Sequence, residues 1–361
     1  MSDDPKLPPF ARWRARVGGW RAQQTRGTWI ALCAIVALAA LVAGTDWITR
    51  PPPLPGYAAV RAGWTPSEAW LYDRHGRLID SIRVDFARRR LAWVPLDKVA
   101  APVKAVVIGA EDRRFASHGG VDGLALGGAL RDRLRGRPAR GASTLTMQLA
   151  AYLAPDLAAP GSRSTLDKLR QMRAAWALER DWSKDRILEA YLNLAGFRGE
   201  AQGIGAAALG LFGKTPETLT RDDALLLAAL LPSPGATAPD LAHRACRLGG
   251  GTDCTRFAGM AASMLGPARS LALDPGLAPH LASRLLTKPG VRVTTTLDMR
   301  VQTLAAQALR RQLQGLGSTR ARDGAVIVAD NATGDIIAYV GGIGGASTAP
   351  QVDGADRKSV V

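Results

Sequence analysis

An uncharged stretch near the N-terminus constrains this chain more than any other feature. From Gly27 to Thr45 the sequence reads GTWIALCAIVALAALVAGT, nineteen residues without a charged side chain. About 20 apolar residues are enough to span a bilayer as a helix. The prolines that begin at Pro51 then prevent the helix from continuing. The sequence therefore predicts a transmembrane anchor over 27–48 and a stiff spacer over 49–65.

The charges before the anchor predict its orientation. Residues 1–26 hold six basic side chains, against two acidic ones at Asp3 and Asp4. Basic residues that flank a membrane helix stay on the cytoplasmic side. We therefore expect a single-pass protein of the cytoplasmic (inner) membrane, with 1–26 as a cytoplasmic tail and the bulk of the chain in the periplasm. A cleaved signal peptide is the alternative, but its apolar region is usually about 7–15 residues long.

The overall composition narrows the range of partners. The 361 residues carry a formal net charge of +16 and are 47% hydrophobic, which is enough for two folded domains. Such a charge suits nucleic acid, anionic lipid or a substrate that contains pyrophosphate. Zinc-finger spacing, RNA-binding aromatic motifs and a dense basic helix are all missing from the sequence. Nucleic acid is therefore not an expected partner.

The three cysteines fit an extracytoplasmic location without requiring it. Cys33 lies inside the apolar run, where it fills space as a small apolar side chain. Cys246 and Cys254 flank the loop RLGGGTD. An oxidising compartment would allow this pair to form a disulfide. The sequence leaves that pairing and two free thiols equally open.

The exported part is predicted to be mainly α-helical before it changes character. A short hairpin is expected in AWLYDRHGRLIDSIRV, residues 69–84, with its turn at Gly76. Residues 102–231 then show helical periodicity, most clearly in TLDKLRQMRAAWALERDWSKDRILEAYLNLAG. Residues 241–290 read as a variable, loop-rich linker. A strand and a helix follow from 291, and GAVIVADNATGDIIAYVGG predicts two strands around a turn.

One glycine-bounded stretch combines residue types that ordinary packing does not explain. GAEDRRFASHGGVDG, residues 109–123, places Glu111, Phe115 and His118 at spacings of four and three. On a helix those steps bring all three to one face. An acid, an aromatic ring and an imidazole fit neither a hydrophobic stripe nor an ordinary solvated face. The pattern predicts the wall of a site.

A second stretch suggests a helix that begins at a ligand. In RGASTLTMQ, residues 140–148, Gly141 permits a tight loop and either Ser143 or Thr144 is able to cap the following helix. The N–H groups of a helix N-terminus suit a diphosphate or sugar hydroxyls. Gln148 lies one turn beyond Thr144 on the same face. Simple capping explains Ser143 but leaves Gln148 unexplained.

Together with two later stretches, these motifs resemble a known family. EDRRFASHGGVD, RGASTLTMQLA, KLRQMRAAWALER and KDRILEAYLN occur in this order and spacing. The set resembles the peptidoglycan glycosyltransferase domain of class A penicillin-binding proteins, the family 51 glycosyltransferases, and GASTLTMQ is most similar to the 1C subgroup. The resemblance covers residues 65–240 and implies a lysozyme-like helical fold, with Lys184, Glu189, Tyr191 and Asn193 as scaffold.

The resemblance also implies a reaction, namely inverting transfer that polymerises lipid II into glycan strands and releases undecaprenyl diphosphate. Such a displacement needs a carboxylate that takes the hydroxyl proton and cations that hold the departing diphosphate. By resemblance Glu111 is the catalytic base. The implied substrate contacts are Asp112, Phe115, His118, Ser143, Thr144, Gln148, Lys168 and Gln171. The implied partners are lipid II, the growing strand and cell-wall synthesis proteins. No metal site and no required cofactor are implied, although a divalent cation is compatible with the reaction.

Two positions depart from the family pattern. Most members have a second glutamate where this chain has Gln171, and an amide is unable to act as a carboxylate. The family also usually has a lysine at the position of Ala151. Arg163, Arg170 or Arg173 are candidates to replace that positive charge. These losses leave two alternatives open: a weakened enzyme, or a membrane-tethered remnant that only binds cell-wall machinery. A lysozyme-like hydrolase is a third alternative.

The C-terminal region resembles the start of the family's transpeptidase domain. DNATGDIIAYVGG and QVDGA match the approach to a penicillin-binding active site, where a Ser-x-x-Lys nucleophile is expected. The sequence instead ends DRKSVV, and no such motif lies in that region. We therefore expect a glycosyltransferase domain over 66–240, a linker over 241–290, and an incomplete transpeptidase domain without transpeptidase activity over 291–361.

Overall fold

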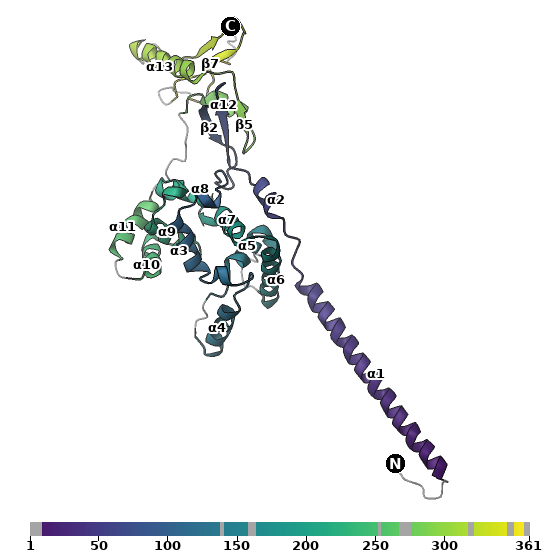
Figure 1. Cartoon of the computed structure of the whole chain (residues 1–361). Helices are drawn as coiled ribbons and strands as arrows, with labels where there is room; N and C mark the ends of the chain where they lie inside the picture. The colour runs from purple at the N-terminus through teal and green to yellow at the C-terminus, as the bar shows by residue number, and fades with distance from the viewer. Residues whose placement is uncertain are drawn as a thin grey trace.

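The computed structural model describes residues 9–137, 141–157, 164–251, 254–266, 276–316, 321–344 and 350–356, with side chains from residue 27 onward. Figure 1 shows a long helix that leads into a helical body, with small sheets at the far end. The helices are α1 (Pro9–Thr49), α2 (Tyr57–Ala62), α3 (Ala101–Glu111), α4 (Gly123–Leu134), α5 (Leu145–Leu153), α6 (Thr165–Asp181), α7 (Lys184–Leu194), α8 (Ile204–Ala207), α9 (Arg221–Leu230), α10 (Ala238–Leu248), α11 (Thr255–Met264), α12 (Pro279–Leu285) and α13 (Met299–Leu316). The strands are β1 (Glu68–Tyr72), β2 (Leu78–Arg83), β3 (Gly196–Arg198), β4 (Ala201–Gln202), β5 (Arg292–Thr294), β6 (Val326–Ala329) and β7 (Ile336–Val340). The mainly α-helical prediction is confirmed.

The apolar run forms the exposed second half of α1. The 23 residues Gly27–Thr49 form the candidate span, which contains an 18-residue window of mean hydropathy 2.2, and none of that window is buried inside the protein. Within the described residues this is the one helix long and apolar enough to cross a membrane. Its end contacts α6, where Arg170 Nε donates to the carbonyl of Ile48 at 2.8 Å and Arg173 Nη1 donates to Thr49 Oγ1 at 2.6 Å. Arg173 also pairs with Asp46.

Glu189 of α7 fastens the spacer to the helical body. Its carboxylate accepts hydrogen bonds from the Tyr57 hydroxyl, from Trp93 Nε1 at 2.6 Å and from the Leu96 N–H at 2.8 Å. Because one carboxylate binds three donors from two separate segments, α2 and residues 93–96, the path from α1 into the body is fixed by the fold.

The main hydrophobic core lies around α9. Residues 223–230 of this helix are all buried, and α3 and α10 pack against it. The helix begins where it does because the Thr220 hydroxyl accepts from the Asp223 N–H, and the Asp223 carboxylate accepts from the Thr220 N–H. Lys214 Nζ donates to the same carboxylate at 2.6 Å. This layer packs against α3, the helix that ends at Glu111.

Residues 241–290 differ from the expected loop-rich linker. Two helices, α10 and α11, pack into the main core through Leu241, Cys246 and Phe257 among others. Cys246 and Cys254 form a disulfide across the loop between them, with their Cα atoms 5.1 Å apart. Alanine, leucine and cysteine repeat at helical spacing along α10, and they bury once α9 provides a partner surface.

The sheets that contain β1 and β7 lie at the end of the protein away from α1 (Figure 1), whereas β3 and β4 pair within the helical body. β1 pairs with β2 in the predicted antiparallel hairpin and with β5 in parallel, so the three strands form one sheet in the order β2-β1-β5. The predicted strand, helix and strand pair after residue 291 are present as β5, α13 and the antiparallel β6 and β7. The hairpin β1–β2 therefore pairs with a C-terminal strand, although the segment that follows it in sequence, from α3 onward, belongs to the helical body.

Candidate active site

The first motif breaks the helix instead of continuing it. Helix α3 ends at Glu111, and residues Phe115–Ser117 form a separate short turn. The expectation that Glu111, Phe115 and His118 share one helical face is therefore wrong. The chain leaves the helix because the Asp112 carboxylate accepts the N–H of Leu145 at 3.0 Å, which draws the backbone towards the start of α5.

Asp112 holds the motif together from inside. Its carboxylate oxygens lie 2.9 and 3.1 Å from Nε2 of His118; the Asp112 side chain is buried and that of His118 is 9% exposed. Phe115 is also buried, with Lys184 Nζ 4.5 Å from its ring centroid. Lys184 Nζ also donates to the carbonyl of His118 at 2.6 Å. These contacts connect the loop after α3 to α5 and α7 and leave Glu111 at its edge.

Glu111 is partly buried, and within the described part of the chain one side chain hydrogen-bonds to its carboxylate. Gln148 Nε2 donates to Glu111 Oε2 at 2.8 Å, and the Tyr191 hydroxyl donates to Gln148 Oε1 at 3.1 Å. Burial raises the pKa of the Glu111 carboxyl above its ordinary value, because it disfavours the charged form. The hydrogen bond from Gln148 opposes that rise, and the negative charge of Asp112 adds to it. A carboxylate with a raised pKa is suited to accept a proton.

The second motif caps α5 with Thr144. The Thr144 hydroxyl accepts from the Met147 N–H at 3.1 Å and donates to the carbonyl of Gly120 at 2.6 Å. Because the N–H groups of Leu145 and Met147 already donate to Asp112 and Thr144, this terminus offers fewer donors to a ligand than its sequence suggests.

Lys168 and Gln171 of α6 reach the same loop from behind. Lys168 Nζ donates to Ser143 Oγ at 2.6 Å and to Gln171 Oε1 at 3.2 Å. Gln171 is buried, and its Nε2 donates to the carbonyl of Leu157 at 3.5 Å. The amide at this position therefore joins α6 to the short turn Pro155–Leu157 that follows α5.

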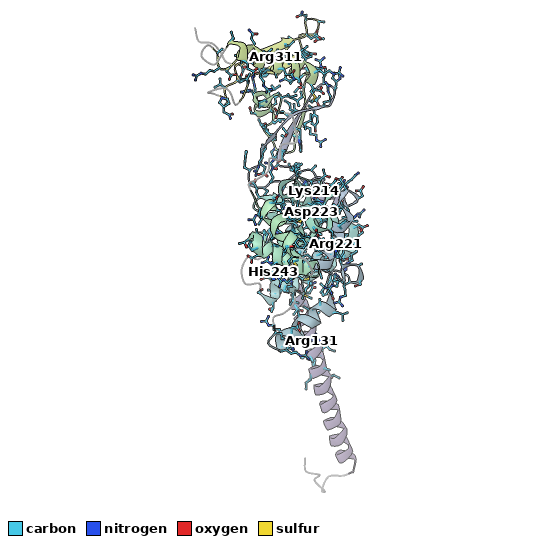
Figure 2. The ribbon with its side chains drawn as sticks, turned by 90° about the vertical axis from the view of Figure 1, so that its left-hand side faces the viewer. Arg131, Lys214, Arg221, Asp223, His243 and Arg311 are labelled. Atoms are coloured by element: carbon cyan, nitrogen blue, oxygen red, sulfur yellow. A yellow bond between two sulfur atoms is a disulfide. The ribbon has the colours of Figure 1, made fainter. Side chains whose placement is uncertain are left out.

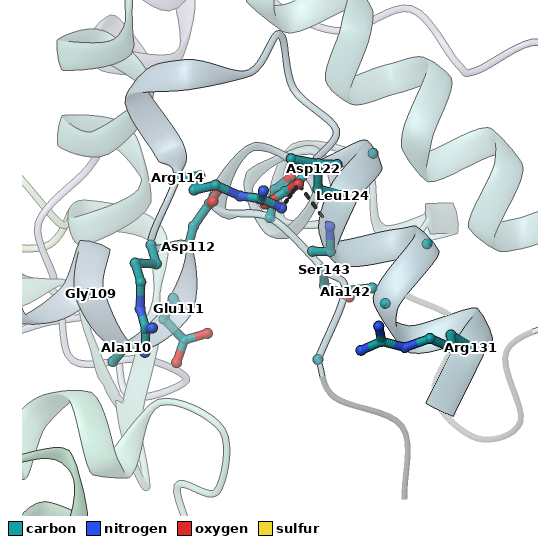
Figure 3. Close-up of a pocket in the computed structure, with 17 residues that line it drawn as sticks. Gly109, Ala110, Glu111, Asp112, Arg114, Asp122, Leu124, Arg131, Ala142 and Ser143 are labelled. Carbon is teal, nitrogen blue, oxygen red and sulfur yellow. Dashed lines mark hydrogen bonds and ion pairs between the residues drawn. The ribbon is translucent and has the colours of Figure 1, made fainter. Parts of the chain in front are cut away.

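A cavity of about 760 Å³ opens between the end of α3, helix α4 and the loop before α5. In Figure 3, Glu111 and Arg131 stand on opposite walls, and the Glu111 carboxylate and the Arg131 guanidinium point into the space between them. Arg113 and Arg114 also line the cavity, and Arg114 Nε donates to Asp122 at 2.9 Å. Among the described residues, the guanidinium of Arg131 has no hydrogen-bond or ion-pair partner. Figure 2 places Arg131 at the end of the helical body from which α1 extends.

The cavity brings together only some of the predicted residues. Those that line it are Glu111, Asp112, Ser143 and Thr144. Those that support it from outside are Phe115, His118, Gln148, Lys168 and Gln171. Sequence reasoning missed Arg131, although Gly123, Gly127 and Arg131 recur at a spacing of four and so share the face of α4 that lines the cavity.

Two of the three arginines considered as replacement charges lie elsewhere. Arg170 and Arg173 bind the end of α1 and do not reach the cavity. Arg163 lies outside the described residues. In the part of the chain that the structure describes, no group of three or more His, Cys, Asp or Glu side chains is placed to hold a metal ion.

Known proteins resemble the part of the chain that contains this cavity. A family model described as Transglycosylase matches residues 75–248. The biosynthetic peptidoglycan transglycosylase of Shewanella amazonensis is 42% identical over 169 residues, which cover 47% of this chain and 66% of that protein. Its counterpart in Rhodospirillum centenum is 38% identical over 183 residues, or 49% of this chain and 77% of that protein. The counterpart in Pasteurella multocida is 41% identical over 142 residues, which cover 39% of this chain and 56% of that protein.

These alignments span only part of each relative, between 56% and 77% of its length. Among solved structures, penicillin-binding protein 1A from Haemophilus influenzae aligns with 74% of this chain and 32% of that one, at 16% identity and a TM-score of 0.30. A superposition this loose supports no comparison of the two folds.

Proposed function

The chain belongs to the peptidoglycan transglycosylase family, and from that premise we propose that it polymerises lipid II into glycan strands. The observation that carries this proposal is the pair of charges across the cavity. Glu111, with its raised pKa, faces a space whose opposite wall carries Arg131 of α4. This arrangement supplies a base and a cation for one displacement.

In the proposed reaction the 4-hydroxyl of an acceptor sugar attacks the anomeric carbon of the donor. The new carbon–oxygen bond forms as the bond from that carbon to the lipid diphosphate breaks, with inversion. Glu111 takes the hydroxyl proton, and Arg131 and Arg113 stabilise the negative charge that develops on the departing undecaprenyl diphosphate. Asp112, His118 and Phe115 act by positioning the loop that carries Glu111, and Lys168 and Gln171 act by holding Ser143.

The proposed reaction needs a base and cations but no redox or carrier group, so we propose no required cofactor. A divalent cation bound to the diphosphate is compatible with this scheme, and adding a chelator to the assay tests for it.

The position of the cavity supports a lipid-linked substrate. Helix α4 and helix α1 both extend from the same end of the helical body (Figure 1). A diphosphate on a membrane lipid would therefore approach the wall that carries Arg131.

Incubation of the purified full chain with lipid-linked disaccharide precursor tests the function. Polymer supports the proposal. Cleaved sugars would instead indicate a hydrolase, and an unchanged precursor would indicate a non-catalytic scaffold.

Arg131→Gln is expected to lower kcat/KM for polymerisation about tenfold or more, because a hydrogen bond to a charged group is worth about 1.5–3 kcal/mol. The loss should grow when salt is reduced, since ionic contacts strengthen at low ionic strength. Arg133→Gln is the matched control, because Arg133 is exposed on the same helix and does not line the cavity. Equal losses in the two variants would contradict a specific role for Arg131.

We further propose that α1 anchors the chain in the inner membrane with residues 1–26 in the cytoplasm. The basic N-terminal segment and the Cys246–Cys254 disulfide, which suits an oxidising compartment, support this orientation. In inside-out membrane vesicles, added protease should therefore remove the arginine-rich start and leave the chain beyond residue 50 intact. Digestion of the helical body in sealed vesicles would show the opposite orientation.

A further inference from the structure

Three side chains from three different helices form a chain of hydrogen bonds that ends at the Glu111 carboxylate. Tyr191 comes from α7, Gln148 from α5 and Glu111 from the end of α3. The hydroxyl of Tyr191 lies 3.1 Å from Gln148 Oε1, and Gln148 Nε2 lies 2.8 Å from Glu111 Oε2. Neither Tyr191 nor Gln148 lines the cavity. Gln148 therefore reaches Glu111, and Tyr191 reaches Gln148, from outside the cavity lining.

The chemistry of the three groups permits one direction of donation. An ionised carboxylate only accepts, so it requires the NH₂ side of the amide. The carbonyl side of the same amide then faces Tyr191, whose hydroxyl has a proton to donate. If the amide rotated by half a turn, its oxygen would face the carboxylate and its NH₂ group would face the phenol. The phenol oxygen could accept from that NH₂ group, but the ionised carboxylate would lose its donor, so the charge of Glu111 and the proton of Tyr191 together favour the observed orientation.

We propose that Tyr191 is a positioning residue for Glu111: by donating to Gln148 Oε1 it fixes the side-chain amide of Gln148, so that Nε2–H faces the carboxylate. The proposal rests on the proposed function in assigning Glu111 as the base. The hydrogen-bond chain itself is testable without it.

The surroundings of Tyr191 suit this role. Its side chain is fully buried, and its ring lies 5.9 Å from that of Tyr152, measured between centroids. Burial is the main cause that raises the pKa of the Tyr191 hydroxyl, so the phenol keeps its proton throughout the range in which a glutamate titrates. Over that range the phenol proton therefore stays available to Gln148 Oε1 both before and after Glu111 takes a proton.

Several charged and titratable groups surround Glu111, and a substitution at Tyr191 leaves the charge of each of the others unchanged. They are Asp112 beside it, Tyr152 and Tyr191 behind it, and the cavity residues Arg113, Arg114 and Arg131. The hydrogen bond from Gln148 stabilises the charged form of Glu111 and so lowers its pKa. Weakening that bond must therefore raise the pKa of Glu111. A base works when it is deprotonated, so the acidic limb of the rate profile must move to higher pH.

Tyr191→Phe is expected to move the acidic limb of the polymerisation rate upwards by about half a pH unit to one unit. The rate below the midpoint should fall about three- to tenfold, and the plateau at higher pH should change less. Tyr152→Phe is the matched control. It removes a phenol hydroxyl from the neighbouring ring, and among the described residues that hydroxyl has no hydrogen-bond partner. Its midpoint should stay at the parent value.

A titration observed by NMR provides a readout that does not depend on activity. The chain has six glutamates, so ¹³C labelling of the glutamate carboxyls gives a small set of signals, and Glu111→Gln identifies the signal of Glu111. In Tyr191→Phe that signal should titrate at higher pH than in the parent. Gln148→Met, which removes the amide and keeps the chain length, should shift it further. Adding Tyr191→Phe to Gln148→Met should then change nothing more, because the hydroxyl acts only through the amide.

These outcomes separate the two proposals. An unchanged Glu111 titration in Tyr191→Phe, or an equal shift in Tyr152→Phe, would overturn the positioning role even if the parent polymerises well. A further shift from Tyr191→Phe in the Gln148→Met background would also overturn it, since Tyr191 would then act by another route. If the parent forms no polymer while the titrations behave as expected, the positioning role stands and the proposed function fails.

Discussion

Glu111→Gln is expected to lower the polymerisation rate about 10²–10⁴-fold, the range that general-base assistance provides. The amide keeps the size of the side chain but has no basic lone pair of comparable strength, so the acceptor hydroxyl keeps its proton. The same assignment predicts that the parent loses activity as pH falls through the pKa of Glu111. Because burial raises that pKa, the loss should begin at a higher pH than for an exposed glutamate.

The same substitution should leave the fold intact or stabilise it. A carboxyl group whose pKa is higher in the folded state than in the unfolded state favours folding below the unfolded pKa, and this contribution is lost as pH rises through the folded pKa. At neutral pH the buried charge of Glu111 therefore opposes folding, and a neutral amide removes that opposition. The melting temperature of Glu111→Gln should accordingly equal or exceed that of the parent.

Glu217→Gln is the matched control for the rate, because Glu217 is exposed on a short turn away from the cavity. It should polymerise like the parent. Near-parental activity in Glu111→Gln would show that the base lies elsewhere, and a large loss accompanied by a lower melting temperature would show that Glu111 is structural.

Gly120→Ala is expected to destabilise the protein by about 3 kcal/mol or more, which places it among the severe single substitutions. Gly120 has a φ of +95°, a conformation that side-chain-bearing residues rarely adopt. A Cβ at this position would lie 2.6 Å from the carbonyl oxygen of Ala175 on α6. Since both atoms of that contact are part of, or attached directly to, the backbone, no side-chain rotation relieves it. The melting temperature should fall by roughly 6–12 °C.

The change should also remove activity, because Gly120 ties the two motifs together. Its carbonyl accepts from the Thr144 hydroxyl that caps α5, so a shift at residue 120 displaces the start of the helix that carries Gln148. Gly119→Ala is the matched control, since a Cβ there meets no atom within 4 Å. Similar behaviour of the two variants would mean that the close approach of residues 120 and 175 is not required.

Much of the architecture can be predicted from the sequence because it depends on local patterns. The uncharged run predicts the spanning half of α1, and helical periodicity predicts α6 and α7. The strand, helix and strand pair after residue 291 also follow from local alternation and turn residues. The family can likewise be identified from motif order, and the comparisons bear it out; the 1C subgroup and the incomplete transpeptidase domain stay predictions.

The sequence did not determine how the site is assembled. Periodicity alone suggested that Glu111, Phe115 and His118 share a helix face, but the contact from Asp112 to Leu145, 33 residues away, ends the helix first. The sequence also left the pairing of Cys246 with Cys254 open. It indicated a linker where α10 and α11 form, because the apolar faces of these helices become buried only against α9.

The partners of Glu111 were likewise decided by the tertiary structure alone. Gln148 is 37 residues from Glu111, and Tyr191 is a further 43 from Gln148. Arg131 faces the cavity because of how α4 packs, whereas Arg170 and Arg173 bind the end of α1. Residue types and local spacing determine which helices form and where they are capped. Which side chains then meet depends on helix packing around the α9 core, because only burial against distant segments fixes the direction in which each face points.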